Sequence, residues 1–181
     1  MANRANLGDS FGVILLVLAV VGGALLLLTS PGGGGSSLQV GTPMPTLAVD
    51  GWLNVPQGET LDLAGKVVVV DLWATWCGPC REEIPRLAKV VEKYQPLGVA
   101  FVGLTSETKR DVPKIEEFLA KRPEFTWPVG WGAMEFFDAL PIEGIPTLLV
   151  FGRDGKLRWS SVGAGQPGLE SALDAVLAEA K

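Results

Sequence analysis

The chain of 181 residues contains no histidine and only two cysteines, and these absences exclude several kinds of site. Without histidine it cannot form a Ser-His-Asp triad, a Cys-His protease pair, or a histidine-ligated zinc or haem. Two cysteines cannot supply a four-thiolate metal site either. We therefore expect no metal site, and any nucleophile must come from a short list of residue types.

Basic residues are also scarce, since 15 Lys and Arg stand against 20 Asp and Glu, which gives a net charge of -5. They are dispersed along the sequence, whereas nucleic-acid binding requires a clustered basic face. We therefore expect no nucleic-acid partner. The chain is 48% hydrophobic and only 19% charged, which makes it more apolar than an average soluble domain.

The apolar excess lies near the amino terminus. Residues 11–28 form an uncharged apolar run of 18 residues. A bilayer span needs roughly 17–25 apolar residues, whereas the core of a cleavable signal peptide has only about 7–15. We therefore predict a transmembrane signal anchor at 11–28, after a short flank at 1–10, and a cleaved signal peptide is the alternative.

The charges around this run predict its orientation. Arg4 is the one basic residue of the flank, and no Lys or Arg follows until Lys66. Because basic residues favour the cytoplasmic side, we predict a single-pass protein of the cell membrane with its main domain on the extracytoplasmic (periplasmic) side. Residues 29–45, rich in Gly, Ser and Pro, are predicted to be a flexible linker to a soluble domain at 46–181.

The soluble domain alternates between strand and helix patterns. Apolar, β-branched runs and an Asp-Gly turn predict strands at 66–72 and 98–104 and a hairpin of 147–151 and 157–162. Apolar residues recur at helical spacing in 84–94, 112–119 and 169–180. Residues 46–63 are predicted to form a short strand or hairpin that caps the sheet. This order predicts an α/β sandwich with a mixed sheet.

The two cysteines stand in the sequence Trp-Cys-Gly-Pro-Cys, with Cys77 and Cys80 after a predicted strand and at the start of a predicted helix. A Cys-x-x-Cys pair in such a unit is typical of a redox dithiol. Backbone N–H groups and the helix dipole stabilise a thiolate at a helix amino terminus, so Cys77 is the predicted nucleophile. Cys80, which we expect to be more buried, is the predicted resolving thiol. A structural disulfide is disfavoured because so short a loop constrains the unfolded chain little.

The residues around the cysteines resemble a known family. Residues 70–80, VDLWATWCGPC, are similar to the active-site segment of thioredoxins, and residues 144–151, GIPTLLVF, resemble their cis-proline strand. Residues 80–85, CREEIP, and 61–66, LDLAGK, together with the predicted anchor, resemble the membrane-anchored TlpA/ResA-like branch. The resemblance implies a thioredoxin-like three-layer sandwich with an amino-terminal extension. It also implies a central insertion at 105–143, which we expect to add a strand or helix pair and to place its aromatic residues in the core.

The resemblance also implies a substrate groove around Cys77. Pro146 would follow a cis peptide bond opposite the cysteines, and the backbone of Ile145 would pair with a substrate strand. The implied groove residues are Trp76, Gly78, Pro79, Ile145, Pro146, Gly163 and Ala164. A cluster of exposed apolar residues beside a nucleophile is typical of a surface that docks protein substrates.

Two carboxylates are candidates for taking the proton from Cys80. Asp71 lies within the apolar run 67–74, where burial would raise its pKa toward the range of a general base. Glu83 matches an acid that the TlpA/ResA-like branch places near its cysteines, although it can equally be a solvated carboxylate of the first helical turn. Many members of that branch carry Asn at the position of Asp71, and both candidates stay open.

The sequence therefore predicts a thiol–disulfide oxidoreductase that needs no organic cofactor. Cys77 attacks a disulfide of a partner protein and Cys80 resolves the mixed disulfide, and Gly-Pro between them resembles reducing thioredoxins. The resemblance implies a membrane-embedded dithiol as electron donor. It also implies cytochrome c maturation as one process in which the protein could take part. The alternatives are an oxidase or isomerase of secreted proteins and a non-catalytic binding or chaperone module. A thiol peroxidase is discounted, because Val70 and Ala74 replace the Pro and Thr of its pattern.

Overall fold

The computed structural model describes residues 38–55 and 61–179. The predicted flank at 1–10, the predicted anchor at 11–28 and the first part of the predicted linker lie outside the described residues. Within the described ranges, no helix has both the length and the apolar character needed to cross a membrane.

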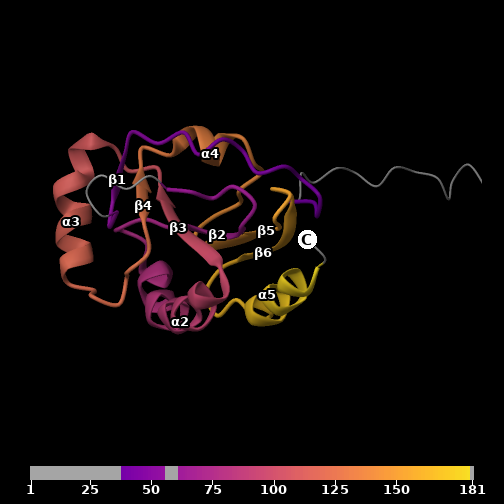
Figure 1. Cartoon of the computed structure of the whole chain (residues 1–181). Coiled ribbons are helices and arrows are strands. Elements are labelled where there is room, and N and C mark those ends of the chain that lie inside the picture. The colour runs from indigo at the N-terminus through magenta and orange to yellow at the C-terminus, as the bar shows by residue number, and fades with distance from the viewer. Residues whose placement is uncertain (1–37, 56–60, 180–181) are drawn as a thin grey trace, which may run out of the picture. The chain divides into compact units, whose positions relative to one another are not determined.

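Six strands form one mixed sheet (Figure 1). They are β1 (Gly51–Leu53), β2 (Val67–Leu72), β3 (Val99–Thr105), β4 (Val129–Trp131), β5 (Thr147–Phe151) and β6 (Leu157–Val162). Their order across the sheet is β1-β4-β3-β2-β5-β6. The central strands β2, β3 and β4 are parallel, and β5, β6 and β1 are antiparallel to their neighbours. The predicted mixed sheet is thus confirmed.

The central strand β2 explains the layering of the fold. Its sequence VVVVDL is buried at every position, as expected for a strand covered on both faces. Alternate side chains of β2 enter two separate apolar cores, with Val69 in one and Val70 in the other. The core that contains Val69 is covered by α2 (Gly78–Tyr94), α3 (Val112–Ala120) and α5 (Leu169–Ala178).

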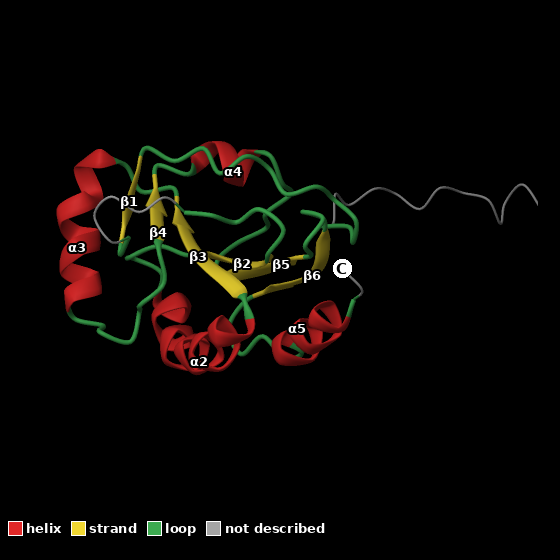
Figure 2. Cartoon of the chain, viewed as in Figure 1, coloured by secondary structure: helices red, strands yellow, loops and turns green. Residues whose placement is uncertain are grey.

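The opposite face is covered by α4 (Met134–Asp138) and by the amino-terminal segment of the domain. Figure 2 shows α2 and α5 on one side of the sheet and α4 on the other. The sheet therefore lies between two layers, as a thioredoxin-like sandwich requires.

The domain begins earlier than the sequence predicted. Residues from Leu38 onward belong to one compact unit, whereas the linker was expected to reach residue 45. Gly41 N–H donates to Leu157 O at 2.8 Å and Met44 N–H donates to Gly155 O at 2.7 Å. These backbone bonds attach the segment to the β5–β6 hairpin, and composition alone cannot reveal them.

The segment before β2 and the insertion supply the strands at one side of the sheet, with β1 at the edge and β4 next to it. Residues 46–55 supply the single strand β1, which pairs with β4 from the insertion. The insertion at 105–143 contains α3, β4 and α4, so it contributes a strand as well as helices. Phe125 and Trp127 are buried and stacked with ring centroids 4.0 Å apart, which confirms their predicted place in the core, and Trp131 is half-buried.

Candidate active site

Three loops lie side by side at one end of the strands, where β2 and β6 end and β5 begins. Leu72, the last residue of β2, pairs with Thr147, the first residue of β5. Thr147 in turn pairs with Val162, the last residue of β6. The three loops that adjoin these residues carry Cys77, Pro146 and Gly163. The strand register therefore brings the predicted groove segments to the same end of the sheet as the cysteines.

Cys77 and Cys80 form a disulfide with their Cα atoms 5.3 Å apart. Cys77 is the N-cap of α2, and its Sγ accepts a hydrogen bond from the backbone N–H of Cys80 at 3.1 Å. This sulfur therefore lies where free N–H groups and the helix dipole stabilise a negative charge. In the reduced protein the same position stabilises a Cys77 thiolate.

Both cysteines are almost fully buried in the disulfide. Cys77 is 4% exposed and Cys80 is 3% exposed, so the predicted difference in burial between them is very small in this state. The first turn of α2 packs both residues against the same apolar core. The difference between the two cysteines is therefore their place on the helix, since only Cys77 caps it.

The predicted groove residues surround the disulfide with mixed exposure. Trp76, at 64% exposed, is the most prominent apolar side chain of the loop. Pro79 and Ala164 are exposed, Gly78, Ile145 and Gly163 are half-buried, and Pro146 is buried. The Ile145–Pro146 peptide bond is cis, as the resemblance implies. Gly163 N–H donates to Pro146 O at 2.8 Å, so the loop after β6 is fixed to the cis-proline loop.

Asp71 is buried on the face of β2 that α2 covers. Strand alternation places it with Val69 and Trp73, and it is only 6% exposed. Burial, the larger cause, and the negative charge of Glu83 raise the pKa of this carboxyl to about 7, and the indole of Trp127 acts in the opposite direction. No Lys or Arg of the described ranges forms an ion pair with Asp71. The carboxyl can therefore change its protonation state near neutral pH.

Glu83 is also buried, at 6% exposed, so it is not the solvated carboxylate that was one of its two interpretations. Its Oε1 forms an ion pair with Arg86, one turn further along α2. Its Oε2 accepts a hydrogen bond from the backbone N–H of Gly165 at 3.0 Å. Glu83 therefore joins α2 to the loop that carries the predicted groove residues Gly163 and Ala164.

Glu107 is a third buried carboxylate at the end of the sheet that carries the cysteine loop, and it was not selected in the sequence analysis. It accepts hydrogen bonds from Thr75 N–H at 2.8 Å, from Thr75 Oγ1 at 2.5 Å and from Thr105 Oγ1 at 3.1 Å. Lys114 Nζ lies 3.8 Å from its Oε1. Because Thr75 precedes Cys77 by two residues, Glu107 fixes the loop that carries the nucleophile. The only sequence signal was an acidic residue two positions after a buried strand.

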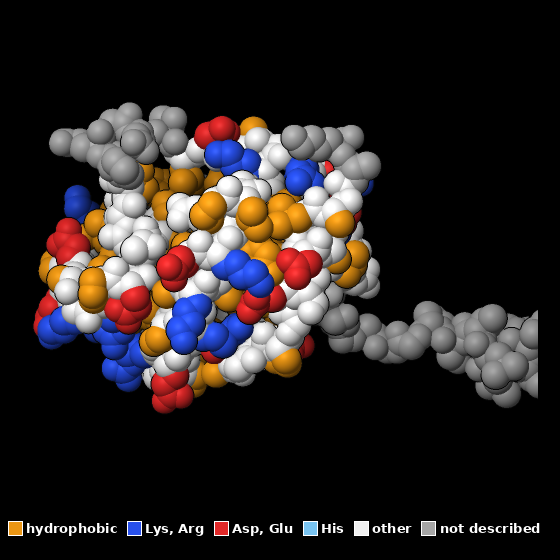
Figure 3. Space-filling view, turned by 60° about the horizontal axis from the view of Figure 1, so that its bottom comes forward, with side chains coloured by type: hydrophobic (Ala, Val, Ile, Leu, Met, Phe, Trp, Pro, Cys, Tyr) orange, Lys and Arg blue, Asp and Glu red, His pale blue; other side chains and the backbone are white. Residues whose placement is uncertain are grey.

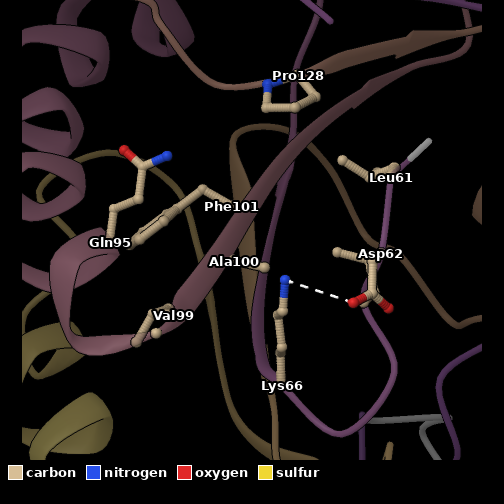
Figure 4. Close-up of a pocket in the computed structure, with 10 residues that line it drawn as sticks. Leu61, Asp62, Lys66, Gln95, Val99, Ala100, Phe101 and Pro128 are labelled. Atoms are coloured by element: carbon tan, nitrogen blue, oxygen red, sulfur yellow. Dashed lines mark ion pairs between the residues drawn. The ribbon is translucent and has the colours of Figure 1, made fainter. Parts of the chain in front are cut away.

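A separate hollow of about 340 Å³ lies at the opposite end of β2 (Figure 4). It is lined at one side by Lys66, which precedes β2 and reaches toward Asp62 with an Nζ–Oδ2 distance of 3.8 Å. Both side chains of this ion pair are exposed, and the hollow holds neither cysteine. Nor do any three acidic or cysteine side chains of the described segments converge as metal ligands.

Comparison with known proteins agrees with this geometry. Residues 39–177 match the Redoxin family. The chain is 25% identical over 148 residues to the thiol-disulfide oxidoreductase ResA of a Bacillus cereus strain, covering 81% of this chain and 83% of the relative. It is 31% identical over 147 residues to the thiol-disulfide oxidoreductase YkuV of Bacillus subtilis (strain 168), covering 78% and 99%.

A solved structure shares the fold. The solution structure of a thioredoxin-like protein in its oxidised form superposes with a TM-score of 0.65 at 30% identity, covering 78% of this chain and 98% of that one. A cysteine pair at the amino terminus of a helix, as Cys77 and Cys80 are in α2, is typical of such redox proteins. The chain belongs to the Redoxin family and is a thiol–disulfide oxidoreductase with a TlpA/ResA-like thioredoxin fold.

Proposed function

We propose that this oxidoreductase is tethered to the cell membrane and reduces disulfides of partner proteins on the extracytoplasmic side. The uncharged run at residues 11–28 supports the tether, and the compact unit that starts at Leu38 follows it after a short Gly-rich segment. The observation that carries the redox role is the Cys77 sulfur at the amino terminus of α2. The exposed Trp76 beside it favours a protein as the other reactant.

The reaction begins from the dithiol form. The Cys77 thiolate attacks one sulfur of the substrate disulfide, the substrate S–S bond breaks, and the leaving thiolate takes a proton from solvent. A mixed disulfide then joins Cys77 to the substrate. Cys80 loses its proton and attacks Cys77 Sγ, which forms the Cys77–Cys80 disulfide and releases the second substrate thiol. Two electrons pass from the enzyme dithiol to the substrate.

Asp71 is the better candidate for the group that accepts the Cys80 proton. Its pKa of about 7 allows it to be ionised before the step and protonated after it. Glu83 already binds Arg86 and the Gly165 N–H, so its oxygens are less free to accept. The role of Glu83 in this proposal is to raise the pKa of Asp71 by its charge.

The oxidised enzyme must be reduced again for each turnover. In an oxidising compartment this requires an external dithiol, and for a tethered domain we propose a membrane-embedded dithiol donor. The disulfide of apocytochrome c, whose reduction gives the two thiols needed for haem attachment, is one substrate class consistent with the resemblance to ResA. No organic cofactor enters the scheme.

Two measurements on the full-length protein, purified in a mild detergent, test the proposal. The Cys80→Ser variant should accumulate mixed disulfides with substrate proteins, whereas Cys77→Ser should form none. A reduction potential near that of thioredoxin, about -270 mV, supports a reductant, and a value near about -120 mV would make the protein an oxidase instead. A Cys77→Ser variant that retains full biological function would show that the groove binds without redox chemistry.

A further inference from the structure

The fold gathers basic side chains that are dispersed in the sequence. Arg81 from α2 and Lys114, Lys121 and Arg122 from α3 and the residues after it line one cleft of about 280 Å³. In Figure 3, Lys and Arg side chains gather at the lower left of the molecule, on the side where α3 lies. Among the described residues, the only acidic one that lines this cleft is Glu117, so the lining carries an excess of three positive charges on a chain of net charge -5.

The cleft is adjacent to the redox loop, residues 73–77, which joins β2 to α2 and carries Cys77. Thr75, two residues before Cys77, forms part of its lining. Arg81 directly follows Cys80, and its Nη2 lies 3.9 Å from the position that a Cβ on Gly78 would occupy. A polypeptide whose disulfide reaches Cys77 is therefore next to the cleft.

The guanidinium groups of Arg81 and Arg122 have N–H donors available for a ligand. Within the described ranges neither Arg81 nor Arg122 forms an ion pair, and the Arg122 guanidinium lies 4.0 Å from the centroid of the Phe118 ring. Stacking on an aromatic ring leaves the edge of a guanidinium free to bind a carboxylate with two parallel hydrogen bonds.

The two lysines of the cleft, Lys114 and Lys121, have acidic neighbours but still attract a negatively charged ligand. Lys121 Nζ pairs with Glu117 at 2.5 Å, and both side chains are about two-thirds exposed to water. Lys114 forms an ion pair with Glu107, at 3.8 Å, and also acts on the charge of Asp111, while the oxygens of Glu107 already accept hydrogen bonds from Thr75. The cleft therefore keeps its positive potential.

We propose that this cleft binds an acidic segment of the protein whose disulfide is reduced at Cys77. The inference rests on the proposed function and names the substrate class that the site prefers. Charges on a ligand in the cleft are within contact distance of the four basic side chains. The Debye length is about 8 Å at physiological ionic strength, so the rest of the acidic chain is largely screened from the ligand. An acidic segment is thus attracted locally although the whole protein is negative.

The experiment compares three disulfide peptides of equal length whose cysteines are flanked by Glu, Gln or Lys. The full-length reduced protein should reduce the Glu peptide with the highest kcat/KM, and raising the salt concentration should remove that advantage. Lys121→Glu should lower kcat/KM for the Glu peptide by roughly threefold to tenfold, raise it for the Lys peptide and leave the Gln peptide unchanged. Lys89→Glu makes the same charge change on the exposed part of α2 outside the cleft and should alter none of the ratios.

The outcomes separate this inference from the proposed function. Equal rates for the three peptides, or a Lys121→Glu variant that changes all of them alike, would overturn the cleft as an acidic-segment site. If not even the Gln peptide is reduced, the reductase proposal fails instead. Whether the cleft binds an acidic segment is then tested without the redox reaction. The measurement is the fluorescence anisotropy of a cysteine-free acidic peptide mixed with the Cys77→Ser/Cys80→Ser double variant. Binding that Lys121→Glu weakens supports the site, and the absence of binding excludes it.

Discussion

Replacing Asp71 with Asn should stabilise the oxidised protein, and the gain should increase with pH. The native pKa of Asp71 is about 7, against an ordinary value of 3.8, because burial disfavours the charged form and Glu83 repels it. Between these two values the native carboxyl holds a proton that the unfolded chain has released. The free energy of unfolding of the wild type therefore falls as the pH rises from about 4 to about 7, and above that it is constant for this group. Asn does not titrate and escapes this loss.

The size of the effect follows from the pKa difference. A shift of about three units corresponds to about 4 kcal/mol, at 1.36 kcal/mol per unit. This is an upper bound, because the surroundings of Asp71 relax when it ionises. The advantage of the Asn variant should therefore be smallest near pH 4 and grow by up to about 4 kcal/mol by pH 8.

Urea denaturation of the full-length oxidised protein between pH 4 and 8.5 measures this difference directly. Subtracting the wild type from the variant cancels the contributions of titrating groups that do not interact with Asp71. Asp138→Asn, which makes the same substitution at an exposed position on α4, is the matched control. An Asp71→Asn difference that stays flat across the same range would refute a raised pKa for Asp71.

Three further variants test the surroundings of the disulfide. Glu107→Gln replaces charge-assisted hydrogen bonds to Thr75 and should reduce the free energy of unfolding by about 1.5–3 kcal/mol, with faster hydrogen exchange at the Thr75 amide; unchanged exchange would show that the loop is held elsewhere. Trp127→Phe removes the group that favours ionised Asp71, so an NMR titration should find its pKa above the wild-type value. Glu83→Gln removes a repelling charge and should lower that same pKa, and a rise would contradict the assigned electrostatics.

The features that sequence could predict are those determined by neighbouring residues. The run VVVVDL marks a strand that is buried on both faces, and the structure places it at the centre of the sheet. The cysteines follow it directly, so a strand, a loop and a helix start were enough to predict that Cys77 caps a helix. The burial of Asp71 followed from the same run.

The features that sequence missed depend on contacts between distant segments. Glu107 and Thr75 are 32 residues apart, and no local pattern predicts that one accepts hydrogen bonds from the other. The basic cleft is similar, since Arg81 and Lys121 come together only because α3 packs beside the redox loop. The early start of the domain at Leu38 depends on backbone hydrogen bonds to a hairpin more than a hundred residues away.

Three buried carboxylates lie near the cysteine pair, and their partners separate their tasks. Glu107 binds Thr75 and Thr105, and Glu83 binds Arg86 and the Gly165 N–H, so both hold backbone segments in place. Asp71 pairs with no cation in the described part of the chain, and burial instead raises its pKa to about 7. A group that serves Cys80 must accept a proton and release it again near neutral pH. Of the three carboxylates, Asp71 alone holds neither the loop of Gly163 and Ala164 nor the loop of Cys77, and we therefore propose that it accepts the Cys80 proton.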